Sequence, residues 1–197
     1  PQKIFLIHAT PLSIAAINSS FKKLWPQASL ANLLDDSLSA DLQRTGKIDQ
    51  SLTDRFIKLA RYACEAGADG ILFTCSAFGT AIDACKDILP IPVLRPNEAM
   101  VAEAFNYGNR LALMATFEPA IPSITEEILA HASALGRSVS IDPIFVANAF
   151  KAAQDGDLDK HDALIAEASR RAGNADVICF AQFSMSTAAE SCAHASE

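Results

Sequence analysis

The chain lacks any long apolar run. No stretch approaches the ~18 to 20 consecutive apolar residues that a membrane-spanning helix needs, and the sequence opens on a strand-like segment instead of a signal peptide. We therefore expect a soluble cytoplasmic protein. Its 197 residues, 50% of them hydrophobic, suffice for one large domain or two smaller lobes.

Basic clusters are also missing. The 16 Lys and Arg residues stand against 23 Asp and Glu residues, which gives a net charge of −7. The longest basic runs are the pairs Lys22-Lys23 and Arg170-Arg171. Because nucleic acids and anionic membranes attract proteins through basic patches, both are excluded as expected partners.

Metal-binding spacings are absent as well. The five cysteines stand at positions 64, 75, 85, 179 and 192, with no CxxC pair and no His/Cys spacing typical of a zinc site. The sequence therefore predicts reduced thiols and no metal.

Small polar residues follow one of the buried strands. The apolar run Ile71–Phe73 predicts a strand of a parallel sheet, and Thr74, Cys75 and Ser76 come directly after it. Ligands of open α/β sheets bind at this edge, toward which the next helix points its N-terminal amides. Their partial positive charge predicts a Cys75 thiolate that acts as acid, base or nucleophile. Simple packing is the alternative, because cysteines are often buried.

Hydrophobic periodicity predicts alternating strands and helices along the chain. Strands are expected over residues 3–7, 71–73, 88–94, 110–115, 139–146 and 176–180, and helices after residue 13 and over 51–67, 97–105, 123–135 and 160–172. Residues 29–50 predict a short strand followed by a mobile acidic loop.

Two segments recur at one spacing. Ala66–Phe73 resembles Ala172–Phe180 with one inserted residue, and Lys3–Leu6 resembles Arg110–Leu113, both at an offset of about 107. Chance similarity between α/β segments is one explanation. The simpler explanation is a pair of similar lobes whose strand ends line a shared cleft.

This repeat sets the predicted fold class and domains. We expect an α/β protein with two pseudo-symmetric Rossmann-like lobes, each a mostly parallel sheet flanked by helices. Residues 1–95 plus 189–197 would form the first lobe and residues 96–188 the second. In this register Cys75 corresponds to Gln182.

At these residues the chain resembles the aspartate/glutamate/hydantoin racemase superfamily over nearly its whole length. The matching segments are Ile7–Pro11, Thr74–Gly79, Pro92–Arg95, Ala115–Thr116 and Ala181–Met185. The resemblance implies no cofactor and a small carboxylate substrate held between two cysteines, one per lobe. These thiols remove and return a proton at the carbon next to the carboxylate. A homodimer or larger homo-oligomer is compatible with it.

The sequence departs from the family pattern at the second cysteine. The first cysteine falls on Cys75 and the second on Gln182, whose amide does not titrate and cannot act as a base. Cys179 lies inside a predicted strand and should point into the core. Related arylmalonate decarboxylases use a single cysteine, although in the other lobe. Racemisation, one-cysteine decarboxylation or elimination, and binding without catalysis therefore remain alternatives.

Several residues near the strand ends are expected to bind the substrate. The set is Thr10, Pro11, Ser76, Ala77, Thr116, Phe183 and Ser184. Their hydroxyl groups could hydrogen-bond a carboxylate or cap helices. Glu118 is a candidate second proton carrier, with a solvated loop carboxylate as the alternative. His8 could line the site or satisfy a backbone group, and His161 is expected on a helix surface.

Overall fold

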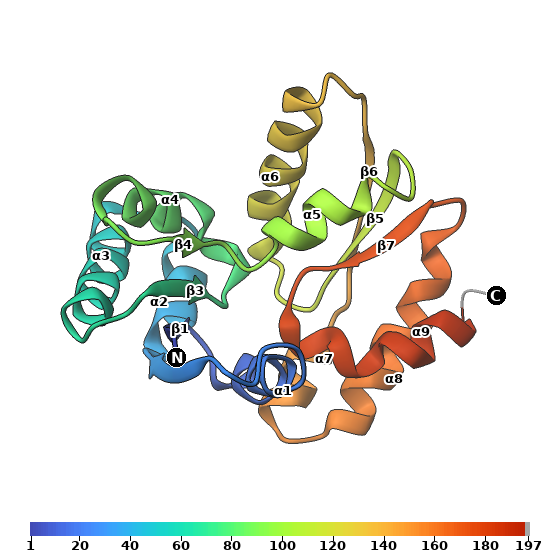
Figure 1. Cartoon of the computed structure of the whole chain (residues 1–197). Coiled ribbons are helices and arrows are strands. Elements are labelled where there is room, and N and C mark those ends of the chain that lie inside the picture. Colours follow the sequence, from blue (N-terminus) through green and yellow to red (C-terminus); the bar gives the residue numbers. More distant parts are fainter. Residues whose placement is uncertain (196–197) are drawn as a thin grey trace. The chain divides into compact units, whose positions relative to one another are not determined.

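The computed structural model describes residues 1–195, which form two compact units divided between Pro96 and Asn97. Each unit is a parallel β-sheet with helices packed around it (Figure 1). The predicted α/β class with two similar lobes is therefore confirmed. No helix in the described part of the chain is long and apolar enough to cross a membrane.

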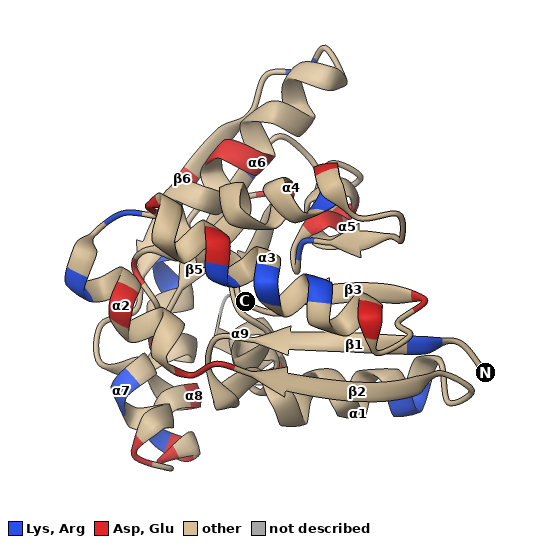
Figure 2. Cartoon of the chain, turned by 90° about the vertical axis from the view of Figure 1, so that its left-hand side faces the viewer, with Lys and Arg blue, Asp and Glu red and all other residues tan. Residues whose placement is uncertain are grey.

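The first unit contains a four-stranded sheet in the order β2-β1-β3-β4. Its elements are β1 (Lys3–His8), η1 (Pro11–Ser13), α1 (Ile14–Leu24), β2 (Ser29–Leu34), α2 (Ser37–Thr45), α3 (Gln50–Glu65), β3 (Gly70–Phe73), η2 (Ser76–Phe78), α4 (Gly79–Ile88) and β4 (Val93–Leu94). β1 and β2 run side by side (Figure 2). The Phe56 ring of α3 packs on Phe73 and Phe78, which fixes α3 beside the end of β3.

Helix α2 replaces the mobile loop that the sequence predicted over this region. Leu38 and Leu42, one helical turn apart, are 0% and 4% exposed and supply an apolar face. Arg55 on α3 pairs with Asp35 and Asp41. The acidic residues that suggested a solvated loop are therefore paired with a guanidinium on a neighbouring helix.

The second unit contains a three-stranded sheet in the order β6-β5-β7. Its elements are α5 (Glu98–Ala104), β5 (Arg110–Ala115), α6 (Ala120–Ala134), β6 (Ser140–Phe145), α7 (Ala149–Gln154), α8 (Leu158–Ser169), η3 (Arg170–Ala172), β7 (Val177–Phe180), η4 (Phe183–Ala188) and α9 (Ala189–Ala195). Ala112 and Met114 of β5 belong to a core cluster with residues of α7, α8 and α9. Because strand side chains alternate, Leu111 and Leu113 point to the opposite face.

The end of the chain packs on the second unit and not on the first. Helix α9 lies against α8, and Cys192 is 4% exposed in the same core cluster as Ile165 and Met185. The predicted assignment of residues 189–197 to the first lobe is therefore wrong as far as Ala195. Residues 196 and 197 lie outside the described residues.

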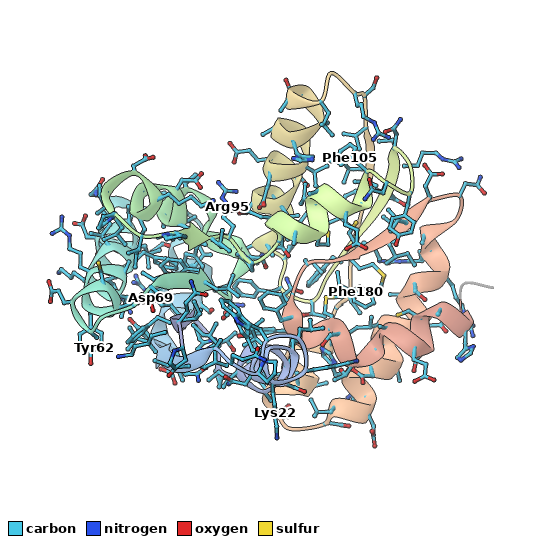
Figure 3. The ribbon with its side chains drawn as sticks, in the orientation of Figure 1. Lys22, Tyr62, Asp69, Arg95, Phe105 and Phe180 are labelled. Atoms are coloured by element: carbon cyan, nitrogen blue, oxygen red, sulfur yellow. The ribbon has the colours of Figure 1, made fainter. Side chains whose placement is uncertain are left out.

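Hydrogen bonds made by equivalent backbone amides in the two units show the internal repeat directly. Asp69 accepts a bond from the Lys3 amide at 2.7 Å, and Asp176 accepts one from the Arg110 amide at 2.9 Å, with each partner 107 positions later in the chain. The amide of Thr74 donates to the carbonyl of Ile7, as that of Ala181 donates to Met114 at the same offset. Figure 3 labels Asp69, which directly precedes β3, and Phe180, the last residue of β7.

Candidate active site

Cys75 lies just beyond the end of β3 in the first unit. Its backbone is extended, and it precedes the short helix η2, which leads into α4. The side chain is nearly buried, with 8% of the residue exposed, and its neighbours Ser76 and Ala77 are buried too. The structure therefore places Cys75 at the predicted strand end, on the sheet edge where α/β proteins bind ligands.

The expected thiolate is not favoured at this position. Burial raises the pKa of the Cys75 thiol to about 11, and hydrogen bonds from the Ala77 amide and with Ser39 only partly oppose it. The sequence-based expectation was wrong because it counted the amides of the next helix and not the loss of water around the sulfur. At neutral pH the group is a thiol and carries a proton to donate.

Ser39, which the sequence analysis missed, lowers the pKa of the Cys75 thiol against the larger effect of burial. It lies on α2, is 8% exposed, and its hydroxyl donates to the Ala9 carbonyl at 2.8 Å. Its hydrogen bond with Cys75 makes it the only side chain among the described residues that shifts the pKa of the thiol through hydrogen bonding. The missed signal was the apolar spacing of Leu38 and Leu42, which predicts a helix and hence a fixed Ser39.

A buried polar network lies beside the thiol at the end of β1. His8 is 0% exposed, with Nδ1 2.7 Å from the Thr74 hydroxyl and Nε2 2.8 Å from Asn32 Oδ1. Asn18 donates to the Ile14 carbonyl and its Oδ1 accepts from Asn32 Nδ2, so the Asn32 oxygen faces the imidazole. Nε2 therefore carries the ring proton and Nδ1 accepts from Thr74. Burial lowers the pKa of His8, although the Asn32 bond opposes the shift.

Thr10 and Pro11, both expected to bind substrate, form the turn after β1. The Thr10 hydroxyl accepts a bond from the Leu12 amide at 3.4 Å, so Thr10 caps η1, and Pro11 is the first residue of that helix. Capping was the alternative explanation for such hydroxyls, and here it accounts for the Thr10 side chain. Ser13, at the end of the same helix, joins the His8 network through a 3.0 Å bond to the Thr74 hydroxyl.

Gln182 holds the matching position in the second unit. It follows β7 with an extended backbone and precedes η4, as Cys75 follows β3 and precedes η2. Its Oε1 accepts bonds from the Thr116 amide at 2.9 Å and the Thr116 hydroxyl at 3.2 Å. Because the Thr116 backbone N–H can only donate, the Gln182 atom that faces it is the oxygen Oε1 and not Nε2. Gln182 Nε2 is buried and has no hydrogen-bond partner among residues 1–195.

The other predicted residues of the second unit divide into two groups. Phe183 and Ser184 follow Gln182 and are partly buried, whereas Glu118 is exposed in the turn after β5. Cys179 lies inside β7 at 2% exposure, and burial raises the pKa of its thiol to about 11. Within this turn, neither a cysteine nor a histidine takes the place of the missing second thiol.

The two turns support different chemistry. The first offers a buried, protonated thiol, and the second offers an amide whose oxygen is occupied and whose N–H groups can still donate. No group of three or more His, Cys, Asp or Glu side chains in the described structure could hold a metal ion. Taken separately, the first turn is suited to donating one proton and the second to hydrogen-bonding an anionic group.

Comparisons with known proteins identify the family and the fold of the chain. The sequence model of the Asp/Glu/Hydantoin racemase family matches residues 8–196, whereas no curated protein matches the chain in a direct search. Glutamate racemase from Francisella tularensis, solved with D-glutamate, is 15% identical with a TM-score of 0.69 over 98% of this chain and 73% of its own. Aspartate racemase from Picrophilus torridus is 13% identical with a TM-score of 0.75, covering 98% and 87%. Allantoin racemase from Klebsiella pneumoniae is 14% identical with a TM-score of 0.65, covering 98% and 79%. At these identities the structures show a shared fold.

Proposed function

The chain belongs to the Asp/Glu/Hydantoin racemase family, and from this we propose that it is a cofactor-independent enzyme acting on a small carboxylic acid. In this proposal Cys75 transfers a single proton to or from the carbon next to the carboxylate. The reaction class is one-base chemistry, namely decarboxylation, elimination or stereospecific protonation. Racemisation by two opposed thiols is the family alternative.

The observation that carries this proposal is the position of Gln182. It occupies the strand-end position that corresponds to Cys75, and two hydrogen bonds from Thr116 hold its oxygen. An amide neither takes nor gives a proton at neutral pH, so a two-base racemase lacks its second base here. A reaction that needs a proton on only one face of the substrate requires Cys75 alone.

The protonation state of Cys75 favours the role of acid. Burial raises the pKa of this thiol to about 11, so the proton is present before the substrate reacts. Loss of carbon dioxide would leave the electron pair of the broken C–C bond on the substrate carbon. That pair would take the proton from the thiol, and the resulting thiolate would recover a proton from water.

The hydrogen-bond donors at the strand ends would hold the negative charge that develops. In the first unit we assign this role to the Ser76 hydroxyl, which directly follows Cys75. Donors aimed at an enediolate stabilise it more than they stabilise the starting acid, because the charge grows during the reaction.

The test is hydrogen exchange and decarboxylation in heavy water. Amino acids, hydantoins and substituted malonates would be incubated with the protein and analysed by mass spectrometry and NMR. We expect deuterium at the carbon next to the carboxylate for one class, with a rate about 10³-fold lower in Cys75→Ser. Cys64→Ser, which changes a partly exposed thiol on α3, should match the unmodified protein. Activity that survives in Cys75→Ser would contradict the proposal.

Binding without catalysis is the second candidate, and the raised pKa of Cys75 favours it, because a resting thiol reacts poorly. This candidate predicts that one of the carboxylates raises the melting temperature without being altered. Stabilisation together with Cys75-dependent turnover would rule it out.

A further inference from the structure

Strand β2 forms an open edge of the first sheet. The strand order is β2-β1-β3-β4, and no strand within residues 1–195 pairs with the outer side of β2. Figure 2 shows β2 at this edge, next to β1. Its six residues, Ser29–Leu34, include no charged residue and no proline. Charge, proline and short length are the features that protect an edge strand from pairing with another chain, and β2 has none of them.

The backbone of β2 turns hydrogen-bonding groups toward the open edge at every second residue. The Ser29 amide donates to the Gln2 carbonyl at 2.8 Å, and the Asp35 amide donates to the His8 carbonyl at 3.0 Å. Successive residues of a strand turn their N–H and C=O groups to opposite sides, so the odd-numbered residues of β2 bond β1. The residues whose backbone groups face the open edge are Leu30, Asn32 and Leu34.

The equivalent edge of the second unit is blocked. Leu6 of β1 pairs with Asn32, and Leu113 of β5, 107 positions after Leu6 in the chain, pairs with Pro143 of β6. The amide of Ser140, the first residue of β6, donates at 2.8 Å to the chain that leads into β5. Pro143 therefore stands at an outward position, where it has no N–H group to offer. The same position carries a donor in the first unit and none in the second.

We propose that the open edge of β2 is the interface of a homodimer, in which a second copy of the chain pairs its own β2 antiparallel to the first. A two-fold axis beside Asn32 lets the two Asn32 residues exchange backbone hydrogen bonds, and it sets Leu30 of each copy opposite Leu34 of the other. The two four-stranded sheets then become one continuous sheet. The contact is self-complementary, so two copies complete it.

Opposite charges at the two ends of β2 favour this occupant and this direction. Lys22 and Lys23 are exposed in the last turn of α1, which leads into the start of β2. Asp36 is exposed directly after the end of β2. Antiparallel pairing brings the lysines of each copy to the end where the other copy has Asp36. Parallel pairing would set lysines against lysines, so the charges select the antiparallel arrangement.

Exposed apolar side chains follow the same rule. Leu24 at the end of α1 is 79% exposed, and Trp25, the next residue, stacks on Phe21 with ring centroids 6.1 Å apart. Leu34, 41% exposed, ends β2. The two-fold axis places Leu24 and Trp25 of each copy at the end where the other copy has Leu34. Dimerisation would therefore remove apolar surface from water at both ends of the paired strands.

Sedimentation velocity over a series of protein concentrations tests the interface. We expect the unmodified chain to form a dimer and Leu30→Pro to raise its Kd by about 10²-fold, because proline removes an outward N–H group from each copy. The ladder with β1 does not use that group. Asn32→Pro is less suitable, because the Asn32 side chain bonds His8 Nε2 at 2.8 Å. Ile141→Pro, at the equivalent outward position of β6, is the matched control and should leave the Kd unchanged.

A charge exchange gives a second test on exposed residues that do not affect folding. The double variant Lys22→Glu/Lys23→Glu should weaken the dimer about 10-fold at low salt, because glutamates then meet Asp36 of the other copy. Adding Asp36→Lys should restore the affinity. Within one copy the length of β2 separates these positions, so recovery reports a contact between copies.

A disulfide tests the register of the two strands. Ala31 of each copy lies opposite Leu33 of the other in the proposed pairing. Oxidation of Ala31→Cys/Leu33→Cys, in a Cys64→Ser background, should therefore give a covalent dimer on a non-reducing gel. Circular dichroism would establish that each variant folds. A chain that stays monomeric at every concentration would overturn the proposal, and so would a dimer whose Kd is unchanged by both Leu30→Pro and the lysine substitutions.

Discussion

The ends of the inner strands in the two units have the same backbone and different side chains. In the first unit His8 and Thr74 meet at the last step of the ladder, where the second unit has Ala115 and Ala181, each 0% exposed. One residue further on, Cys75 in the first unit corresponds to Gln182 in the second. One repeat thus supports its turn with a buried polar network, and the other with closely packed alanines.

The difference shows how each turn is kept in place. Gln182 is held from the side, because Thr116 donates to its oxygen from both backbone and hydroxyl. The Cys75 sulfur bonds the Ala77 amide and Ser39, while the residue before it, Thr74, is anchored to His8 and Ser13. Buried networks of this kind rigidify their surroundings when every member is satisfied. The first unit, which carries the titrating Cys75, therefore also has the more extensive hydrogen-bond network beside its turn.

Restoring a thiol in the second unit should produce the largest change. In Gln182→Cys we expect racemisation to rise about 10²- to 10⁴-fold above the parent protein, the range that a positioned acid–base group contributes. Chiral chromatography of the substrate found in heavy water measures it, and Gln182→Ser serves as the control. Efficient racemisation by the unmodified protein would contradict the single-base reaction.

Removing the network from the first unit should reduce stability. His8→Ala leaves buried polar partners unsatisfied and opens space, so we expect a loss of about 2 to 4 kcal/mol in the free energy of unfolding. Urea denaturation measures it, with His131→Ala on α6 as the control. An unchanged midpoint would show that the network is as dispensable as its alanine counterpart.

His8 should also make stability depend on pH. Because burial lowers the pKa of His8 in the folded protein, the unfolded chain binds the proton more readily. Stability should therefore fall as pH decreases from about 6.5 toward the lower folded value. In His8→Ala this part of the pH dependence should disappear from denaturation curves at pH 8 and pH 5.5.

The smallest effect should come from the carboxylates at the opposite ends of the strands. Hydrogen bonds from Arg110 lower the pKa of Asp176 to about 2. Its contribution is present above the ordinary carboxyl pKa of 3.8 and is lost as pH falls through that value toward 2. Asp176→Asn should lower the melting temperature slightly at pH 7, more than Asp69→Asn, and the deficit should vanish near pH 2. A deficit that persists there would point to packing instead of charge.

Much of this architecture could be predicted from sequence because it depends on local patterns. The run Ile71–Phe73 and the recurring Ala-Gly segments predict both sheets, and the offset between these segments pairs Cys75 with Gln182. The same patterns could not show the state of the thiol, because desolvation depends on what packs over the sulfur.

The errors share this non-local origin. The spacing of Leu38 and Leu42 predicts helix α2, but the ion pairs that join its residues to Arg55 on α3 are not contained in that segment. Ser39 was missed because its surroundings depend on how α2 packs against the rest of the unit. His161 was expected on a helix surface, yet it is 1% exposed and bonded to Asp162, on a helix against which both α7 and α9 pack. Each depends on an ion pair or a helix contact that the periodicity of one segment does not contain.

The paired carboxylates, Asp69 beside Lys3 and Asp176 beside Arg110, lie at the strand ends away from both turns. Each accepts a hydrogen bond from the backbone amide of the first residue of β1 or β5. Neighbouring inner strands are thus anchored to each other at one end by the same kind of contact in both units, so the side chains at the opposite end can differ without changing how the strands are aligned.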